Sequence, residues 1–161
     1  MEANGWQLFV DPLIEGQLQT LTNRVESLRS TGPETYLEHP SAKLLATIHR
    51  YMTEIIPRDP NAPEFRQGNT LGADNRHWFR AKFHVRYRLF FRFSTKHKMI
   101  IYVWVNDEKS LRKAGSKTDP YSVFRSMLDS GNPPQNFERL LQRSKQLESH
   151  AKSPFRKTDR H

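Results

Sequence analysis

An α+β fold is predicted by three features of this 161-residue sequence, which place helical and strand patterns in separate parts of the chain. Apolar residues recur every three or four positions over residues 13–28 and again over residues 41–56, the spacing of amphipathic helices. Residues 78–93 instead alternate between apolar and mainly basic side chains. Residues 99–105 are almost continuously apolar, and both of these later patterns are typical of strands.

The N-terminal part of the chain is expected to contain one strand and two helices. The apolar stretch at residues 4–10 predicts the strand. Asp11-Pro12 then begins the first helix, because aspartate is a favoured N-cap and proline is favoured in the first turn. Gly32-Pro33 ends that helix, and the second one spans residues 41–56. Both apolar stripes are expected to face the core.

Residues 56–76 predict a long surface connection between these helices and the sheet, because they contain three prolines and two glycines. Long loops of this kind are often functional. Arg66 lies in this loop and could reach a ligand, although a solvated loop charge is the simpler interpretation.

The alternating block WFRAKFHVRYRLFFRF, Trp78 to Phe93, is longer than an ordinary strand. Its odd positions are all apolar, its even positions are mostly basic, and this parity is unbroken. A two-residue hairpin loop would exchange the two faces, so a hairpin here needs an odd number of turn residues. The candidates are His84, Val85 and Arg86, and a single bent strand is the alternative.

The remaining elements follow this block. The run MIIYVWV at residues 99–105 predicts a central strand covered on both faces. Asp119-Pro120 repeats the cap-and-proline signal for a helix that ends at Gly131. A last helix is expected over residues 135–149. We expect residues 1–149 to form a single domain and residues 150–161 to form a basic, disordered tail.

The charge distribution indicates a polyanionic partner. The formal net charge is +9, and residues 75–106 contain eight Lys and Arg residues and no Asp or Glu. Ordinary solvated surfaces mix both signs. An acid-free basic segment with interleaved aromatic residues suits a phosphate backbone instead. A merely solvated charged face is the alternative interpretation.

Several chemistries find no support in the sequence. There is no cysteine, which excludes thiolate-based zinc sites and fits a reducing cytosol, so we expect a cytoplasmic protein. No two of the seven histidines have the helical i,i+4 spacing of metal ligands, and no glycine-rich phosphate loop is present. We therefore expect no metal and no cofactor. No apolar run reaches the roughly 18 residues of a membrane span, and we expect no membrane partner.

A cationic surface could itself be an active site for RNA, because RNA carries its own nucleophile, the 2′-hydroxyl. The protein must orient that hydroxyl, remove its proton, stabilise the charge on phosphorus and protonate the leaving 5′-oxygen, and none of these tasks requires a metal. Arg88 suits the phosphate because a guanidinium is always charged and fork-shaped. Lys82, flanked by arginines on its face, is the candidate general base, since neighbouring cations favour the neutral form of an amine.

Six stretches of the sequence carry a resemblance to a known family: NGWQLFVDP, KLLATIH, FRQGNTLG, RYRLFFRF, WVNDEKSLRKAGSKTDPYSVF and GNPP. Over residues 4–142 the chain resembles the YhaV family of bacterial toxins, within the wider RelE-like group of toxin ribonucleases. The resemblance implies a RelE-like fold, in which an N-terminal helical hairpin packs on a mainly antiparallel four-stranded sheet with C-terminal helices.

The resemblance also implies a function and partners. It implies the toxin of a type II toxin–antitoxin system, a metal-independent endoribonuclease that cleaves messenger RNA, free or ribosome-bound, and so inhibits translation and growth. The implied partner is an AbrB-like, PrlF-type antitoxin, through which alone the toxin would contact operator DNA.

Site residues are carried over from the same motifs. Two basic residues of the strand before YRL, the arginine of YRL, a basic residue after the last strand, and the tyrosine that opens the next helix form the expected site. Lys113 and Lys117 are alternatives for the basic residue after the last strand. The expected catalytic residues are Arg80, Lys82, Arg88, Lys117 and Tyr121. The expected substrate-binding residues are Arg66, His84, Arg86, Arg92 and Lys113.

Two other functions fit the same residues. A non-catalytic protein could bind RNA or the ribosome and block translation by occupancy, and mapping of new RNA 5′ ends would separate it from a nuclease. A DNA-binding module ranks last, because the basic residues belong to a sheet and not to a helix sized for the major groove. An antitoxin could cover the basic face with an acidic segment or bind the N-terminal helices.

Overall fold

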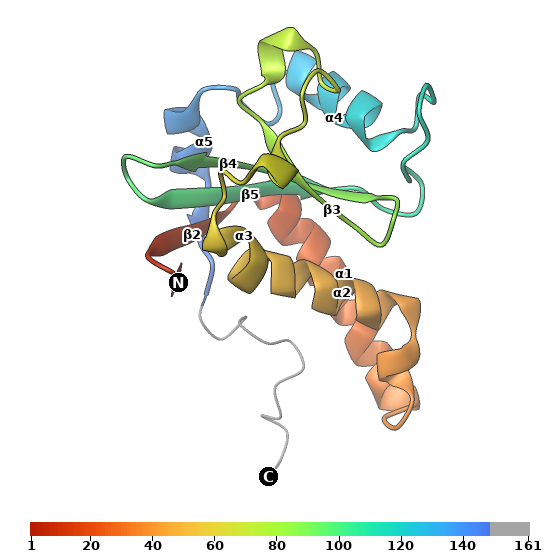
Figure 1. The fold of residues 1–161 in the computed structure, drawn as a ribbon. Coiled ribbons are helices and arrows are strands. Elements are labelled where there is room, and N and C mark those ends of the chain that lie inside the picture. Colours follow the sequence, from red (N-terminus) through yellow and green to blue (C-terminus); the bar gives the residue numbers. More distant parts are fainter. Residues whose placement is uncertain (149–161) are drawn as a thin grey trace.

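The computed structural model describes residues 1–148, which form an open sheet with helices on both faces (Figure 1). Its long strands are β2 (Trp6–Val10), β3 (Phe79–Phe83), β4 (Tyr87–Ser94) and β5 (Met99–Val105). Two short strands, β1 (Glu2–Ala3) and β6 (Lys145–Gln146), both pair with β2. The expected sheet of four strands therefore has six, in the order β1-β2-β5-β4-β3 with β6 beside β2, and it is antiparallel except between β2 and β5.

An N-terminal helical hairpin covers one face of the sheet, as expected (Figure 1). Its helices are α1 (Pro12–Thr31) and α2 (Pro40–Arg50). A π-helical stretch (Tyr51–Ile55) and α3 (Ile56–Arg58) continue α2, so the predicted second helix extends slightly further than residue 56. Three short 3₁₀ turns lie in the connections, at Tyr36–Glu38, Pro63–Phe65 and Ala73–Asn75.

The opposite face is covered by α4 (Pro120–Asp129) and α5 (Phe137–Arg143) (Figure 1). The two predicted N-caps are confirmed: Asp11 Oδ2 accepts from the Leu13 amide at 3.0 Å, and Asp119 Oδ2 accepts from the Tyr121 amide at 3.1 Å. No helix within residues 1–148 is long and apolar enough to cross a membrane.

The predicted hairpin with an odd-numbered turn is confirmed. Phe83 pairs with Tyr87, so the turn contains His84, Val85 and Arg86. Both strands therefore keep their odd-numbered side chains on one face of the sheet and their even-numbered ones on the other. Odd residues such as Leu89 and Phe91 pack toward α1 and α2, and even residues such as Phe90 pack toward α4. His84 and Val85 have left-handed backbone conformations, with φ of 47° and 65°.

The even-numbered face is not the open cationic surface that the alternation suggests. Helix α4 covers it, and the ring of Phe124 stacks on Phe90 with 4.3 Å between ring centroids. Arg80 and Arg88 are only 8% and 7% exposed. Trp78 and Phe90, the aromatic residues of this face, thus belong to a core under α4, and Arg80 and Arg88 lie at its margin.

The C-terminal helix is shorter than predicted. Helix α5 ends at Arg143, and β6 then pairs with β2, with the Leu147 amide donating to the Leu8 carbonyl at 2.9 Å. This pairing provides hydrogen-bond partners for the backbone groups at the outer edge of β2, and it buries Leu147. A continued helix would do neither. Residue 149 and the predicted tail, residues 150–161, lie outside the described residues.

Candidate active site between the sheet and helix α4

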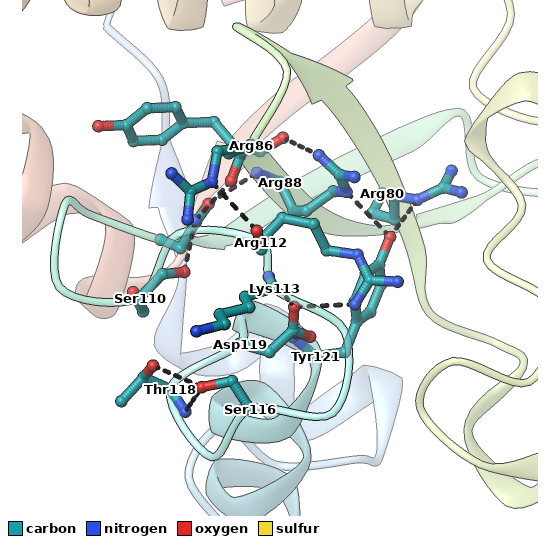
Figure 2. A network of polar contacts seen from close by, with 12 residues as sticks. Arg80, Arg86, Arg88, Ser110, Arg112, Lys113, Ser116, Thr118, Asp119 and Tyr121 are labelled. Atoms are coloured by element: carbon teal, nitrogen blue, oxygen red, sulfur yellow. Dashed lines mark hydrogen bonds and ion pairs between the residues drawn. The ribbon is translucent and has the colours of Figure 1, made fainter.

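The hydroxyl of Tyr121 is the meeting point of two buried arginines (Figure 2). Arg80 Nε donates to Tyr121 Oη at 2.7 Å, and Arg88 Nε donates to the same oxygen at 3.1 Å. Antiparallel pairing of β3 with β4 sets the two arginines near each other on the face toward α4, and the cap at Asp119 sets Tyr121 in the first turn of α4. Strand register and helix capping together therefore define this cluster.

Within residues 1–148, neither arginine pairs with a carboxylate. Arg80 Nη1 donates to the Glu64 carbonyl at 2.9 Å, and Arg88 Nη1 donates to the carbonyls of Val85 and Tyr87 at 3.1 and 2.9 Å. All of these acceptors are neutral oxygens. Within residues 1–148, every buried side-chain nitrogen and oxygen has a hydrogen-bond partner. In this part of the chain the Nη2 atoms of Arg80 and Arg88 have no hydrogen-bond partner, so neither atom is fully buried.

The bonding of Tyr121 limits what its hydroxyl can do. A phenolic oxygen has two lone pairs and one hydrogen. Because both guanidinium groups donate to it, its remaining capacity is to donate that hydrogen. No side chain or carbonyl within residues 1–148 accepts it. The hydrogen of the Tyr121 hydroxyl therefore has no acceptor among the described residues.

A third guanidinium, that of Arg112, lies over the ring of Tyr121, with 4.9 Å from Cζ to the ring centroid. Arg112 Nη1 is paired with Asp119 Oδ1 at 2.8 Å. Asp119 is 2% exposed and also accepts from the amides of Lys113 and Tyr121 at 2.7 and 3.1 Å. One carboxylate thus caps α4 and fixes Arg112 against the tyrosine (Figure 2).

The loop that carries Arg112 is bound to strand β4. Asn106 accepts from the Arg88 amide at 2.7 Å and donates to the carbonyls of Arg86 and Ser110 at 3.1 and 2.8 Å. The Arg112 amide donates to the Arg86 carbonyl at 3.0 Å, and Arg86 Nε donates to the Arg112 carbonyl at 3.1 Å. These bonds hold the loop in place without regular secondary structure.

Sequence reasoning missed Arg112 and assigned Asp119 only as a cap. The available signal was the position of Arg112 in the basic segment KSLRKAGSK, which the expected lysines share. The structure places the side chains of Lys113 and Lys117 in exposed positions of this loop, and the amide of Lys113 bonds to Asp119.

Of the other predicted residues, one lies beside the Tyr121 cluster and the rest lie away from it. Lys82 pairs with Arg88 across the β3–β4 ladder and is exposed on the face toward α4, so it lies beside the cluster. His84 is directed to the opposite side, where its Nε2 lies 2.8 Å from Thr47 Oγ1 of α2. Arg66 lies in the loop before β3, with Nη2 donating to Asn61 Oδ1 at 3.4 Å. The structure does not bring His84 to Tyr121.

Arg92 belongs to a separate cluster at the far end of β4. Its guanidinium lies over the rings of Trp78 and Phe137, 5.2 and 5.5 Å from their centroids, and donates to the Gln135 carbonyl at 2.8 Å. Burial lowers the pKa of Arg92 to about 10. The pKa of His77 is lowered, mainly by burial and to a smaller extent by the charge of Arg92. A hydrogen bond with Gln135 opposes this shift. Trp78 is fully buried.

The described residues offer guanidinium groups rather than metal ligands. Within residues 1–148, no three His, Cys, Asp or Glu side chains lie close enough together to hold a metal ion. A cluster of three guanidinium groups around one phenol can bind a phosphate diester, spread its developing negative charge and supply a proton. Fold and site together are typical of an α+β protein that acts on a phosphodiester backbone.

Comparisons with known proteins agree with this class. Residues 8–145 match the model of the YhaV toxin family, described as a toxin with endonuclease activity, of a toxin–antitoxin system. The chain is 45% identical over 150 residues to Toxin YhaV of Escherichia coli O6:H1 (strain CFT073), covering 92% of this chain and 96% of the relative. It is 43% identical over 146 residues to Ribonuclease toxin YhaV of Escherichia coli K12, covering 89% and 95%. No solved structure shows a significant match.

This chain belongs to the YhaV family of toxins with endonuclease activity, which act in toxin–antitoxin systems. The resemblance seen in the sequence motifs is therefore confirmed.

Proposed function

We propose that this protein is an endoribonuclease that cleaves messenger RNA without a metal and so arrests translation and growth. The relative in Escherichia coli K12 is named a ribonuclease toxin. The observation that carries the proposal is the pair of guanidinium groups, from Arg80 and Arg88, that share the hydroxyl of Tyr121 and pair with no carboxylate within residues 1–148.

Arg80 and Arg88 bind the scissile phosphate. Their solvent-facing Nη2 atoms donate to its non-bridging oxygens, in the charge-assisted geometry that guanidinium groups favour. Negative charge on these oxygens increases in the transition state, so fixed cations at low exposure stabilise the transition state more than the bound substrate.

The reaction uses the hydroxyl of the substrate as the nucleophile. The 2′-oxygen forms a bond to phosphorus, the bond from phosphorus to the 5′-oxygen breaks, and the products are a 2′,3′-cyclic phosphate and a 5′-hydroxyl. Lys82, exposed beside Arg88, takes the proton of the 2′-hydroxyl. Tyr121 donates its hydrogen to the leaving 5′-oxygen, and the hydrogen bonds from Arg80 and Arg88 stabilise the phenolate that results.

Arg112 is the basic residue after the last strand that completes the site, in preference to Lys113 or Lys117. Its contact with the Tyr121 ring and its ion pair with Asp119 support this role. In this proposal the other N–H groups of Arg112 contact the same phosphate.

The fold and partner that we propose follow the same family. The order of helical hairpin, sheet and tyrosine-bearing helix supports a RelE-like fold. The net charge of +9 suits an antitoxin of the AbrB-like, PrlF type that covers the arginine cluster with an acidic segment and carries the toxin to operator DNA.

The proposal is tested with purified protein and a mixed-sequence transcript in excess EDTA, with and without ribosomes. New 5′ ends and 2′,3′-cyclic phosphates are expected from the wild-type protein. Arg80→Ala and Arg88→Ala should give none, whereas Arg24→Ala, which alters an exposed arginine of α1, should cleave normally. Circular dichroism checks that each variant is folded.

Three outcomes would contradict the proposal. Cleavage that requires added Mg²⁺ would disprove metal independence. RNA binding without new ends would indicate a protein that acts by occupancy. Full cleavage by both arginine variants would place the active site elsewhere.

A further inference from the structure

We propose that a hollow on the opposite side of β3 from Tyr121 is a subsite for one nucleotide of the RNA, next to the cleaved bond. This inference rests on the proposed ribonuclease function. The hollow measures about 340 Å³. Its lining residues are Asn61, Arg66, Gln67, Gly68, Arg76 and Phe79.

The chemistry of the lining suits a nucleotide. Phe79 offers an aromatic ring, and Arg66 and Arg76 offer two guanidinium groups. Arg76 donates from Nε and Nη2 to Asn69 Oδ1 at 2.8 and 2.6 Å, and Arg66 donates to Asn61. Both acceptors are neutral amide oxygens, and neither arginine is ion-paired within residues 1–148. Each guanidinium therefore retains its charge and further N–H groups for a phosphate.

The loop that forms the hollow is preorganised by an amide network. Gln67 is buried, and its Oε1 accepts from Thr70 Oγ1 at 2.7 Å and from the Leu71 amide at 3.1 Å. Its Nε2 donates to the Asn75 carbonyl at 2.8 Å, and Asn75 Nδ2 donates back to the Leu71 carbonyl at 2.8 Å. A loop held in this way loses little conformational entropy when it binds a ligand.

The loop that lines the hollow also contacts Arg80 of the proposed active site. The carbonyl of Glu64 accepts from Arg80 Nη1, and Arg66, two residues later, pairs with Phe79 of β3. Two residues of extended chain span about 7 Å. Strand β3 lies at one end of the sheet (Figure 1). An RNA strand that passes around it would place one phosphate at Arg80 and the neighbouring nucleotide in the hollow.

The test measures binding separately from cleavage. The probe is a fluorescein-labelled RNA decamer of mixed sequence with 2′-O-methyl groups at every position, which removes the nucleophile. Fluorescence anisotropy gives its Kd at several salt concentrations. For Arg66→Ala/Arg76→Ala we expect a Kd about tenfold or more higher and a salt slope smaller by about 1.4, because each lost phosphate contact of a single strand accounts for about 0.7.

Further variants separate the contribution of the Phe79 ring to binding from that of the two arginine charges. Phe79→Leu keeps an apolar side chain but loses the stacking face, so its Kd should rise at least about fivefold with an unchanged salt slope. Arg66→Lys/Arg76→Lys should keep the wild-type slope and bind more weakly than wild type, because the planar fork is lost. Arg24→Ala is the matched control and should bind like wild type. Thermal unfolding of each variant is measured in parallel.

Failure of this inference differs from failure of the proposed function. If the double alanine variant binds the decamer with wild-type Kd and slope while the wild-type protein cleaves RNA, only the subsite is disproved. A slope reduced as much by the lysine pair as by the alanine pair would also disprove it. If the wild-type protein neither binds the decamer nor cleaves RNA, both proposals fail.

Discussion

The hydroxyl of Tyr121 combines a structural role with the chemical role that we propose for it. It is the hydrogen-bond acceptor for two guanidinium groups that lie at the margin of a hydrophobic core. The same bonds leave its hydrogen as the group that can be transferred. Loss of the oxygen should therefore affect stability and activity through different mechanisms, which two measurements can separate.

Tyr121→Phe keeps the ring and removes the oxygen. We expect unfolding free energy to fall by about 1–3 kcal/mol, because the Nε groups of Arg80 and Arg88 lose an acceptor at low exposure. We expect the single-turnover cleavage rate to fall by about 10²–10⁴, the usual contribution of a general acid. Tyr51→Phe is the control, since that hydroxyl makes only a 3.4 Å contact with the Lys82 carbonyl. A rate equal to that of wild type would remove Tyr121 from the chemistry.

At the scale of elements, the β3–β4 hairpin and the start of α4 hold the site together. The hairpin turn contains a strained residue: Val85 has φ of 65° and is 85% exposed. The left-handed conformation is unfavourable for a β-branched residue. Its carbonyl accepts from Arg88 Nη1, so the turn conformation and the position of an arginine of the proposed site are linked.

Val85→Asn should stabilise the protein by about 1 kcal/mol, because asparagine tolerates the left-handed conformation and Val85 buries little surface. Chemical denaturation measures the change. Thr95→Asn, in the exposed turn between β4 and β5, is the control and should be neutral. A lower stability for Val85→Asn would show that the valine side chain makes favourable contacts that outweigh the strain.

Asp119→Asn tests the carboxylate at the start of α4. Asparagine can still cap the helix, but it loses the ion pair that holds Arg112 over Tyr121. We expect a small loss of stability and a fall in kcat of about tenfold or more, since misplaced groups in an active site slow the chemical step. Asp129→Asn, at the exposed end of α4, should change neither. A normal kcat for Asp119→Asn would mean that Arg112 does not need this partner.

Local sequence patterns predicted most helices and strands, and the features that they did not predict depend on long-range contacts. Parity along residues 78–93 predicted the hairpin with its three-residue turn, and the two Asp-Pro pairs predicted the helix starts. The position of Arg112 depends on bonds to β4 and α4 from a loop without periodicity. The end of α5 depends on pairing with β2, more than a hundred residues away. No local pattern contains such information.

At the scale of the whole molecule, the C-terminal part is fastened to the N-terminal part by a largely buried ion pair. Arg143 of α5 donates from Nε and Nη2 to the two oxygens of Asp11, at 2.7 and 2.8 Å. Asp11 is fully buried and also caps α1. Its hydrogen bond, more than its charge, raises the pKa of Arg143. The pair therefore connects the junction of β2 and α1 with the last helix.

Arg143→Ala should lower the unfolding free energy by about 3 kcal/mol, because it leaves a buried carboxylate without its partner. This is the lower end of the usual range, since the Arg143 side chain is 32% exposed and water can replace part of the interaction. The double variant Asp11→Asn/Arg143→Ala should lose less than the sum of the single variants. Additive losses in chemical denaturation would show that the pair contributes no coupling.

The two ends of the described chain meet at one residue of β2. The Leu8 amide donates to the Met1 carbonyl, and the Leu8 carbonyl accepts from the Leu147 amide, each at 2.9 Å. In a circular permutant, a short Gly-Ser linker would join residue 148 to residue 1, and the new termini would lie in the turn after α1. We expect this permutant to fold, because the two ends that the linker joins are close together. Its new termini would be available for labels or immobilisation without a change to the strand that completes the sheet.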